Sequence, residues 1–284
     1  MQTLAIYQSL WAMERRQPDR MEWPLAEKLR RITDGGYDGV SSEWTDRAHA
    51  RTVAAHAAAT GTGIEGVCFP RTVDALKPLL DLASEFPVTH LNVQPNAMPR
   101  TVAEAVGILE GWLRLAEEVS FPVMFETHRD RMTTDLHFTL DLLDALPDLP
   151  LLADLSHFFV GREFPVPVSD DHHAEIRRIL SNAWAFHGRV ASREQVQIEV
   201  SFPQHRPNLD LFLGWWGTGF DSWRGRAGVD DTLIFTCELG PQPYAISGAD
   251  GADLSDRWTD ALLLRQEVRT VWDRATPNRE RSVK

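Results

Sequence analysis

Short apolar runs alternate with longer amphipathic stretches along almost the whole chain. The runs at 88–95 (VTHLNVQP) and 121–126 (FPVMFE) are short and rich in β-branched or aromatic residues, as buried strands are. Between them, TVAEAVGILEGWLRLAEEV at 101–119 repeats apolar residues every three or four positions, which predicts a helix. The pattern therefore indicates alternating strands and helices, as in a parallel sheet.

Eight runs of this kind can be interpreted as strands, and most are followed by a helical stretch. They lie at 4–10, 37–44, 63–70, 88–95, 121–126, 149–158, 182–190 and 231–240. We expect one α/β domain, a single (β/α)8 TIM barrel over residues 1–275, followed by a flexible polar tail at 276–284. An open, doubly wound sheet is the alternative. No glycine-rich dinucleotide loop and no P-loop motif occurs.

The region at 190–229 reads as a long insertion after the seventh strand. It shows no clear periodicity and contains Trp215, Trp216 and Trp223. A long insertion at this end of a barrel is typical of a lid or a substrate wall. An exposed aromatic cluster is equally typical of a homodimer contact. The sequence leaves both interpretations open.

Net charge and cysteine content indicate which classes of partner and which cellular compartment to expect. The chain has 284 residues and a formal net charge of −12. An acidic protein repels phosphate backbones, so we expect no nucleic acid partner. The two cysteines, Cys68 and Cys237, cannot build a disulfide framework and suit buried thiols in a reducing cytoplasm. We expect neither a signal peptide nor a membrane partner, because no basic region precedes the first apolar stretch and no apolar run could span a bilayer.

The candidate chemistry lies where the last four strands end. These runs read VMFETH, LLADLSH, WAFHG and IFTCELG, and they reach Glu126, Asp154, His187 and Glu238. The carboxyl ends of barrel strands converge on one face, where active sites lie. Three carboxylates and one imidazole predict a site for one divalent metal ion, with Mn²⁺ expected ahead of Mg²⁺, Co²⁺ and Zn²⁺.

With these motifs and this strand order, nearly the whole chain resembles the xylose-isomerase-like TIM barrel superfamily. That superfamily includes sugar phosphate isomerases and epimerases, inosose dehydratases and the endonuclease IV branch. The resemblance implies a metal held by Glu126, Asp154, His187 and Glu238. It also implies that His157, from the D-x-x-H motif of ADLSH, faces the substrate.

The chain departs from the family pattern at two places. Arg189 stands third in His187-Gly188-Arg189, where two-metal members carry an aspartate, so we expect no second metal there. His128, Arg129 and Asp130 follow Glu126, where epimerases usually have another glutamate. The endonuclease branch needs more early-strand histidines than His90 alone.

Six further residues are candidates for contacting the substrate. They are His128, Arg129, Arg189, Gln94, Trp11 and Trp44. His128 lies two residues past Glu126, so a continuing strand would place both on one side. Gln94 shares this spacing with His90 and Asn92. The two tryptophans lie near the ends of the first two strands, and aromatic rings there could pack against sugar C–H faces or in the core.

The resemblance implies a metal-dependent isomerase or epimerase of a keto-sugar or related polyol. In this hypothesis a proton next to a metal-bound carbonyl is removed and an enediolate forms. Glu126 and Glu238 would exchange the proton from opposite faces, and His157 would hydrogen-bond the oxyanion. The alternative keeps the same site in a dehydratase or lyase acting on a keto-inositol or keto-glycoside. A non-catalytic sugar-binding barrel is the third hypothesis, so each one expects a small carbohydrate partner.

Overall fold

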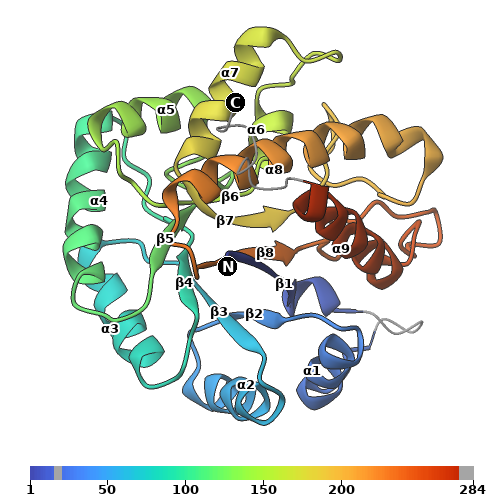
Figure 1. Ribbon diagram of the computed structural model, residues 1–284, viewed down its shortest axis with the longest axis horizontal. Helices are drawn as coiled ribbons and strands as arrows, with labels where there is room; N and C mark the ends of the chain where they lie inside the picture. The colour runs from blue at the N-terminus through green and yellow to red at the C-terminus, as the bar shows by residue number, and fades with distance from the viewer. Residues whose placement is uncertain (16–20, 275–284) are drawn as a thin grey trace, which may run out of the picture.

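Eight parallel strands close into a barrel in the computed structural model, which describes residues 1–15 and 21–274. Each strand pairs with the next one along the chain, and the last strand pairs with the first (Figure 1). The strands are β1 (Thr3–Ser9), β2 (Gly39–Glu43), β3 (Gly63–Cys68), β4 (His90–Val93), β5 (Val123–Glu126), β6 (Leu151–Ala153), β7 (Ala183–Gly188) and β8 (Thr232–Cys237). The expected (β/α)8 barrel is confirmed, and the open sheet is excluded.

Helices surround the barrel (Figure 1). They are α1 (Leu25–Asp34), α2 (Arg47–Thr60), α3 (Val73–Ser84), α4 (Val102–Ala116), α5 (Leu136–Ala145), α6 (Ser156–Gly161), α7 (Asp170–Ser181), α8 (Arg206–Arg226) and α9 (Arg257–Arg274), with 3-10 turns at Trp11–Met13 and Pro203–His205. Five helices begin after a side chain that accepts a hydrogen bond from a first-turn amide. These capping residues are Asp46, Thr72, Thr101, Asp135 and Ser169. Capping fixes where a helix starts and so how long the preceding strand-to-helix loop is.

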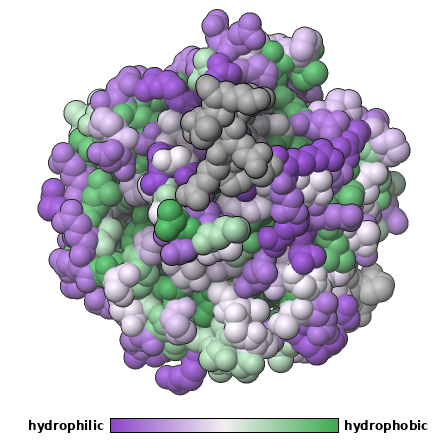
Figure 2. Space-filling model, viewed as in Figure 1, coloured by the Kyte–Doolittle hydropathy of each residue, from purple (hydrophilic) through white to green (hydrophobic). Residues whose placement is uncertain are grey.

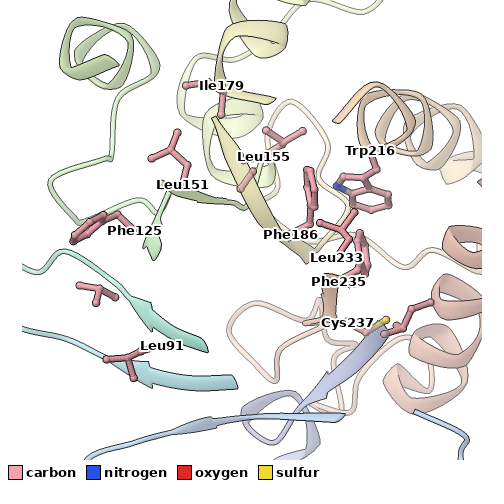
Figure 3. Packing of buried hydrophobic residues seen from close by; sticks show 14 of the residues in the cluster. Leu91, Phe125, Leu151, Leu155, Ile179, Phe186, Trp216, Leu233, Phe235 and Cys237 are labelled. Atoms are coloured by element: carbon pink, nitrogen blue, oxygen red, sulfur yellow. The ribbon is translucent and has the colours of Figure 1, made fainter. Parts of the chain in front are cut away.

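The segment at 190–229 differs from the expected insertion, because most of it is the regular helix α8. Trp215, Trp216 and Trp223 are buried, with exposed fractions of 4%, 0% and 2%. They pack against the barrel, and the ring of Trp216 lies edge-on to Phe235 with 5.0 Å between centroids (Figure 3). The expectation of a lid or an exposed homodimer contact built from these tryptophans is therefore wrong.

Glycines explain why this helix reads as irregular. Gly214, Gly217, Gly219 and Gly225 interrupt its apolar pattern, and glycine is a poor helix former. At Gly219 the reason is packing, since a Cβ there would lie 2.7 Å from the ring of Phe186 on β7. Gly219 thus allows α8 to lie close to the sheet, and it also weakens the sequence pattern that would have predicted a helix.

Side chains that point into the barrel form an apolar layer with polar groups above it. The apolar layer consists of Tyr7, Met124, Leu152, Ala185 and Ile234. Gly63 at the start of β3 makes room for this layer, because a Cβ there would lie 1.8 Å from the hydroxyl of Tyr7. Side chains alternate along a strand, so Glu126 and His187 point inward two residues further along β5 and β7. The layer therefore supports the polar groups from below.

Polar and apolar side chains are interspersed on the face shown in Figure 2. Within residues 1–15 and 21–274, no helix combines the length and the apolar character that crossing a membrane requires. Cys68 and Cys237 are buried free thiols, as expected. The polar tail expected at 276–284 lies outside the described residues.

Candidate active site

The ends of β5, β7 and β8 bring three candidate ligands together. Glu126 is the last residue of β5, His187 lies near the end of β7, and Glu238 directly follows β8. One potential ligand atom from each lies within 4.8 Å of the others, and all three side chains are buried. Inward alternation along neighbouring parallel strands is what aims these side chains at one point.

Asp154 is held differently from the other three candidate ligands. Its Oδ1 accepts hydrogen bonds from the amide and the hydroxyl of Ser156, at 3.0 and 2.6 Å. Its Oδ2 accepts one from Nε of Arg189 at 3.2 Å. Burial raises the pKa of Asp154, and the nearby Arg189 guanidinium opposes that shift. Both oxygens therefore have protein partners, and Asp154 lies outside the three-residue group.

Arg189 is the cation already present in this site. The side chain is 1% exposed, and its NH2 group donates to Oε2 of Glu238 at 2.5 Å. Its NH1 group donates to Oε1 of Gln197 at 3.0 Å, and its guanidinium lies 4.6 Å from the ring centroid of Tyr244. Burial would lower the pKa of Arg189, but Glu238 and Asp154 raise it, so the charge is retained.

His187 lies among carboxylates on every side. Its Nε2 is 2.8 Å from Oε1 of Glu65, and its Nδ1 is 3.2 Å from Oε2 of Glu238 and 3.6 Å from Oε1 of Glu126. Burial would lower the pKa of His187, but Glu65, Glu238 and Glu126 raise it well above its usual value. Burial likewise would raise the pKa of Glu126, but His187 lowers it to about 2. The cluster therefore attracts a cation, either a proton or a metal.

The donor set fits a divalent cation. Oε1 of Glu126 and Nδ1 of His187 are both buried, and neither has a hydrogen-bond partner among the described residues. Buried polar atoms normally have partners, and a cation between these two atoms and Glu238 would supply one. Two carboxylates and one imidazole are ligands that Mn²⁺, Mg²⁺, Co²⁺ and Zn²⁺ accept in proteins.

Glu65, on β3, is a residue of this site that the strand-end pattern does not reveal. It is fully buried, and its Oε2 is 2.8 Å from Nε2 of His90 and 3.2 Å from the hydroxyl of Thr236. Its contact with Nε2 of His187 assigns the proton to that nitrogen and leaves Nδ1 as the ligand atom. The available signal was a lone acid inside the apolar run GIEGVC.

His157 and His128 form a second group with Glu126. Single ligand atoms of the three lie within 4.8 Å of one another, and the two imidazole centroids are 3.9 Å apart. Both ring nitrogens of buried His157 lack a hydrogen-bond partner in the described part of the chain. Burial and the nearby His128 and Arg189 lower the pKa of His157 well below its usual value. His157 is therefore a neutral imidazole. Its Nε2 lies 3.5 Å from Oδ2 of Asp154, and its N–H makes no hydrogen bond within the described residues.

His128 has a fixed orientation. Its Nδ1 lies 2.5 Å from the carbonyl oxygen of Arg129, so the proton on Nδ1 donates there. Its Nε2 then faces the hydroxyl of Tyr244 at 3.5 Å. Arg129 itself is exposed and lies over the Tyr244 ring, with 4.6 Å to the centroid.

A cavity of about 690 Å³ opens beside these groups. Glu238, Arg189, His128 and Gln94 belong to its lining, together with Trp11. Trp11 lies against the backbone of Gly240, where a Cβ would be 2.0 Å from the indole ring. Glu126, His157 and His187 are fully buried outside this lining, so Glu238 is the candidate acid that a ligand in the cavity reaches first.

Two of the expected substrate contacts are placed differently. Trp44 is fully buried outside the cavity lining and packs edge-on against Phe86, in room left by Gly66, so it is withdrawn from the substrate-binding set.

Arg129 is likewise absent from the lining, and Arg131 takes its place there. Arg131 donates to Oε1 of Gln94 at 3.2 Å. The sequence interpretation also missed Gln197 and Tyr244, which orient Arg189 and His128.

Comparison with known proteins identifies the fold. No protein-family model and no curated protein matches this chain. A xylose isomerase-like TIM barrel protein from Mycobacterium smegmatis, solved in complex with magnesium, is 13% identical with a TM-score of 0.60, over 95% of this chain and 98% of that one. The chain has the xylose isomerase-like barrel fold.

Two other solved structures are similar to this chain in fold. A probable 3-DHS dehydratase, AsbF, from Bacillus anthracis is 12% identical with a TM-score of 0.57, over 94% of this chain and 98% of that chain. A sugar phosphate isomerase/epimerase from Parabacteroides distasonis is 10% identical with a TM-score of 0.56, over 96% and 94%. At these identities the likeness concerns the fold, and the chemistry must be argued from the residues.

Proposed function

We propose that this xylose isomerase-like barrel is a divalent-metal-dependent isomerase or epimerase of a keto-sugar or related polyol. One observation carries the proposal: Glu126 and Glu238, from β5 and β8, converge with His187 beside a cavity. Two carboxylates reaching one point from different strands can exchange a proton with the same substrate carbon. Their buried, unpartnered ligand atoms also support a bound cation.

In this proposal each residue of the site has one role in the reaction. A bound divalent cation supplies Lewis-acid polarisation of a substrate carbonyl. Glu238 lines the cavity and removes the proton from the neighbouring carbon, and Glu126, the buried second carboxylate of the cluster, returns one. Neutral His157 donates its N–H to the oxyanion that develops, and burial makes that hydrogen bond strong. Arg189 orients Glu238 through their 2.5 Å contact.

A dehydratase or lyase using the same site is the second candidate, and the pair His128 and Tyr244 favours it. Their 3.5 Å contact places a hydroxyl donor, Tyr244, against Nε2 of His128, and both side chains line the same cavity as Glu238. An epimerase does not need them, whereas departure of a β-hydroxyl or an aglycone needs a proton donor. Analysis of the product for loss of water or aglycone separates the two reactions.

Proton exchange tests the shared first step. The Mn²⁺-loaded protein is incubated with a panel of keto-sugars in D2O, and deuterium at the carbon next to the carbonyl is followed by NMR. We expect exchange in wild type and a loss of at least about 100-fold in Glu238→Gln, since removing a general base costs about that much. Glu117→Gln is the matched control, an exposed acid at the end of α4 outside the cavity lining. Full exchange by Glu238→Gln would end this assignment, and binding without any exchange would indicate a non-catalytic sugar-binding barrel.

Metal content tests the cation site. Wild type and His187→Ala are purified identically without chelator and analysed by plasma mass spectrometry. We expect about one equivalent of Mn, Mg, Co or Zn in wild type and its loss in the variant. Equal metal content in both proteins would contradict the site.

A further inference from the structure

We propose that the cavity contains a second subsite, at the ends of β1 and β2, that binds a neutral hydroxyl-rich ring. The substrate is then a keto-glycoside or keto-disaccharide instead of a free or phosphorylated monosaccharide. This inference rests on the proposed function, because the first ring is the one that reacts beside Glu238. Size, hydroxyl groups, charge and aromatic surface each support it.

The cavity is larger than one sugar ring requires. Its volume of about 690 Å³ lies within the range of roughly 300–1,000 Å³ that holds drug-sized ligands. One molecule of liquid water takes about 30 Å³, so the cavity has room for roughly 23 water-sized groups. A hexose has 12 non-hydrogen atoms and a keto-disaccharide has 23. The cavity therefore holds both rings of a disaccharide, one at the Glu238 end and one beyond it.

The remaining lining includes small hydroxyl residues on adjacent strands. Ser9 ends β1 and is the register partner of Ser41 on β2, and Ser42 follows. The hydroxyls of Ser9 and Ser41 make no hydrogen bond to another residue within 1–15 and 21–274, whereas Ser42 contacts Nε2 of His49 at 2.7 Å. A serine hydroxyl both donates and accepts, which matches a sugar hydroxyl. Small side chains also leave this part of the cavity deep.

The charges of this region disfavour a phosphate or carboxylate. Each of the three Lys and Arg side chains in the described lining already has an acidic partner: Lys28 has Glu22 at 2.6 Å, Arg131 has Asp130 at 3.4 Å, and Arg189 has Asp154 and Glu238. The acids Glu14, Glu43 and Asp46 also belong to the lining. Burial lowers the pKa of His49, so this histidine adds no compensating cation at neutral pH. An anionic group would meet net negative charge, whereas a neutral ring would not.

Aromatic rings complete the lining. Trp11 and Tyr244 lie edge-on with 5.0 Å between centroids, and Trp23 and Phe69 belong to the same cavity. Arg129 and Arg189 already lie over the Tyr244 ring, so the aromatic faces offered to the C–H groups of a sugar are those of Trp11, Trp23 and Phe69. Such contacts are independent of ligand charge. The combination of hydroxyls and rings therefore selects a neutral carbohydrate.

Calorimetry with the Mn²⁺-loaded protein tests the subsite. The probes are D-fructose, D-fructose 6-phosphate and four keto-disaccharides that differ in linkage: lactulose, maltulose, turanose and palatinose. We expect at least one disaccharide to bind about tenfold or more tighter than D-fructose, and the phosphate no tighter. The double variant Ser9→Ala/Ser41→Ala removes both free hydroxyls. It should lose about tenfold in affinity for that disaccharide and keep D-fructose within about twofold.

The controls separate this inference from the proposed reaction. Ser84→Ala, on α3 outside the cavity, should bind every probe as wild type does, and circular dichroism should confirm that all variants fold. If no disaccharide binds tighter than D-fructose, or if the phosphate binds best, the subsite is refuted, although exchange in D2O can still support the reaction. If a disaccharide binds in the serine-dependent way but no keto-sugar exchanges, the reaction fails and the subsite stands.

Discussion

Replacing Glu65 with Gln should weaken metal binding although Glu65 is not itself a ligand. Glu65 is fully buried and contacts Nε2 of His187 and of His90, each at 2.8 Å. The substitution keeps the shape and removes the charge that fixes the His187 tautomer. Hydrogen bonds to charged groups contribute about 1.5–3 kcal/mol. Partners of metal-binding histidines are worth roughly 10–100-fold in metal affinity, or about 1.4–2.8 kcal/mol, so both routes give the same range.

The assay is a competition titration of Mn²⁺ or Zn²⁺ against a chelator of known affinity, with wild type and Glu65→Gln at one pH. Glu43→Gln makes the same chemical change on the neighbouring strand β2 without contacting His187 and should bind as wild type does. Circular dichroism checks that Glu65→Gln is folded. A folded Glu65→Gln that binds metal within about threefold of wild type would refute the reasoning. His187 would then be oriented by its packing alone.

Two further predictions concern stability. Without metal, in EDTA, His187 has a raised pKa, so the stability that its proton contributes is present below about pH 6.5 and is lost as the pH rises through the folded-state pKa. The Tm of the wild type should therefore fall more steeply between pH 6.5 and 9 than that of His187→Gln, and parallel curves would contradict this. Trp216→Ala empties a fully buried position between α8 and β8 (Figure 3) and should cost about 3–5 kcal/mol in urea unfolding, whereas exposed Met98→Ala should cost under about 0.5 kcal/mol.

The sequence predicts the barrel and the converging strand ends because both follow from local patterns. Apolar runs and helical periodicity do not depend on which residues meet in space, so the eight strands were found. Helix α8 was missed because four glycines interrupt its apolar pattern, and one of them, Gly219, is required by packing against Phe186, which the sequence does not show. Glu65 was missed because the pattern directed attention to strand ends, whereas this acid lies inside β3. Trp44 was wrongly expected to contact the substrate because it lies at a strand end. Its side chain instead packs into the space beside Gly66.

Arg189 is where the site could least be predicted from the sequence. Its basic side chain argued against a second metal, but pairing with Asp154 and Glu238 depends on side-chain geometry that no spacing reveals. That pairing changes the coordination expected for the first metal. Four protein ligands close a tetrahedral zinc site, whereas Mn²⁺ or Mg²⁺ takes about six ligands and would keep positions open even with four. Because Arg189 holds Asp154 at 3.2 Å, a bound cation would have Glu126, His187 and Glu238 as its protein ligands. Arg189 would thus replace one carboxylate ligand of the expected set, and the positions left open would lie beside the cavity that Glu238 lines.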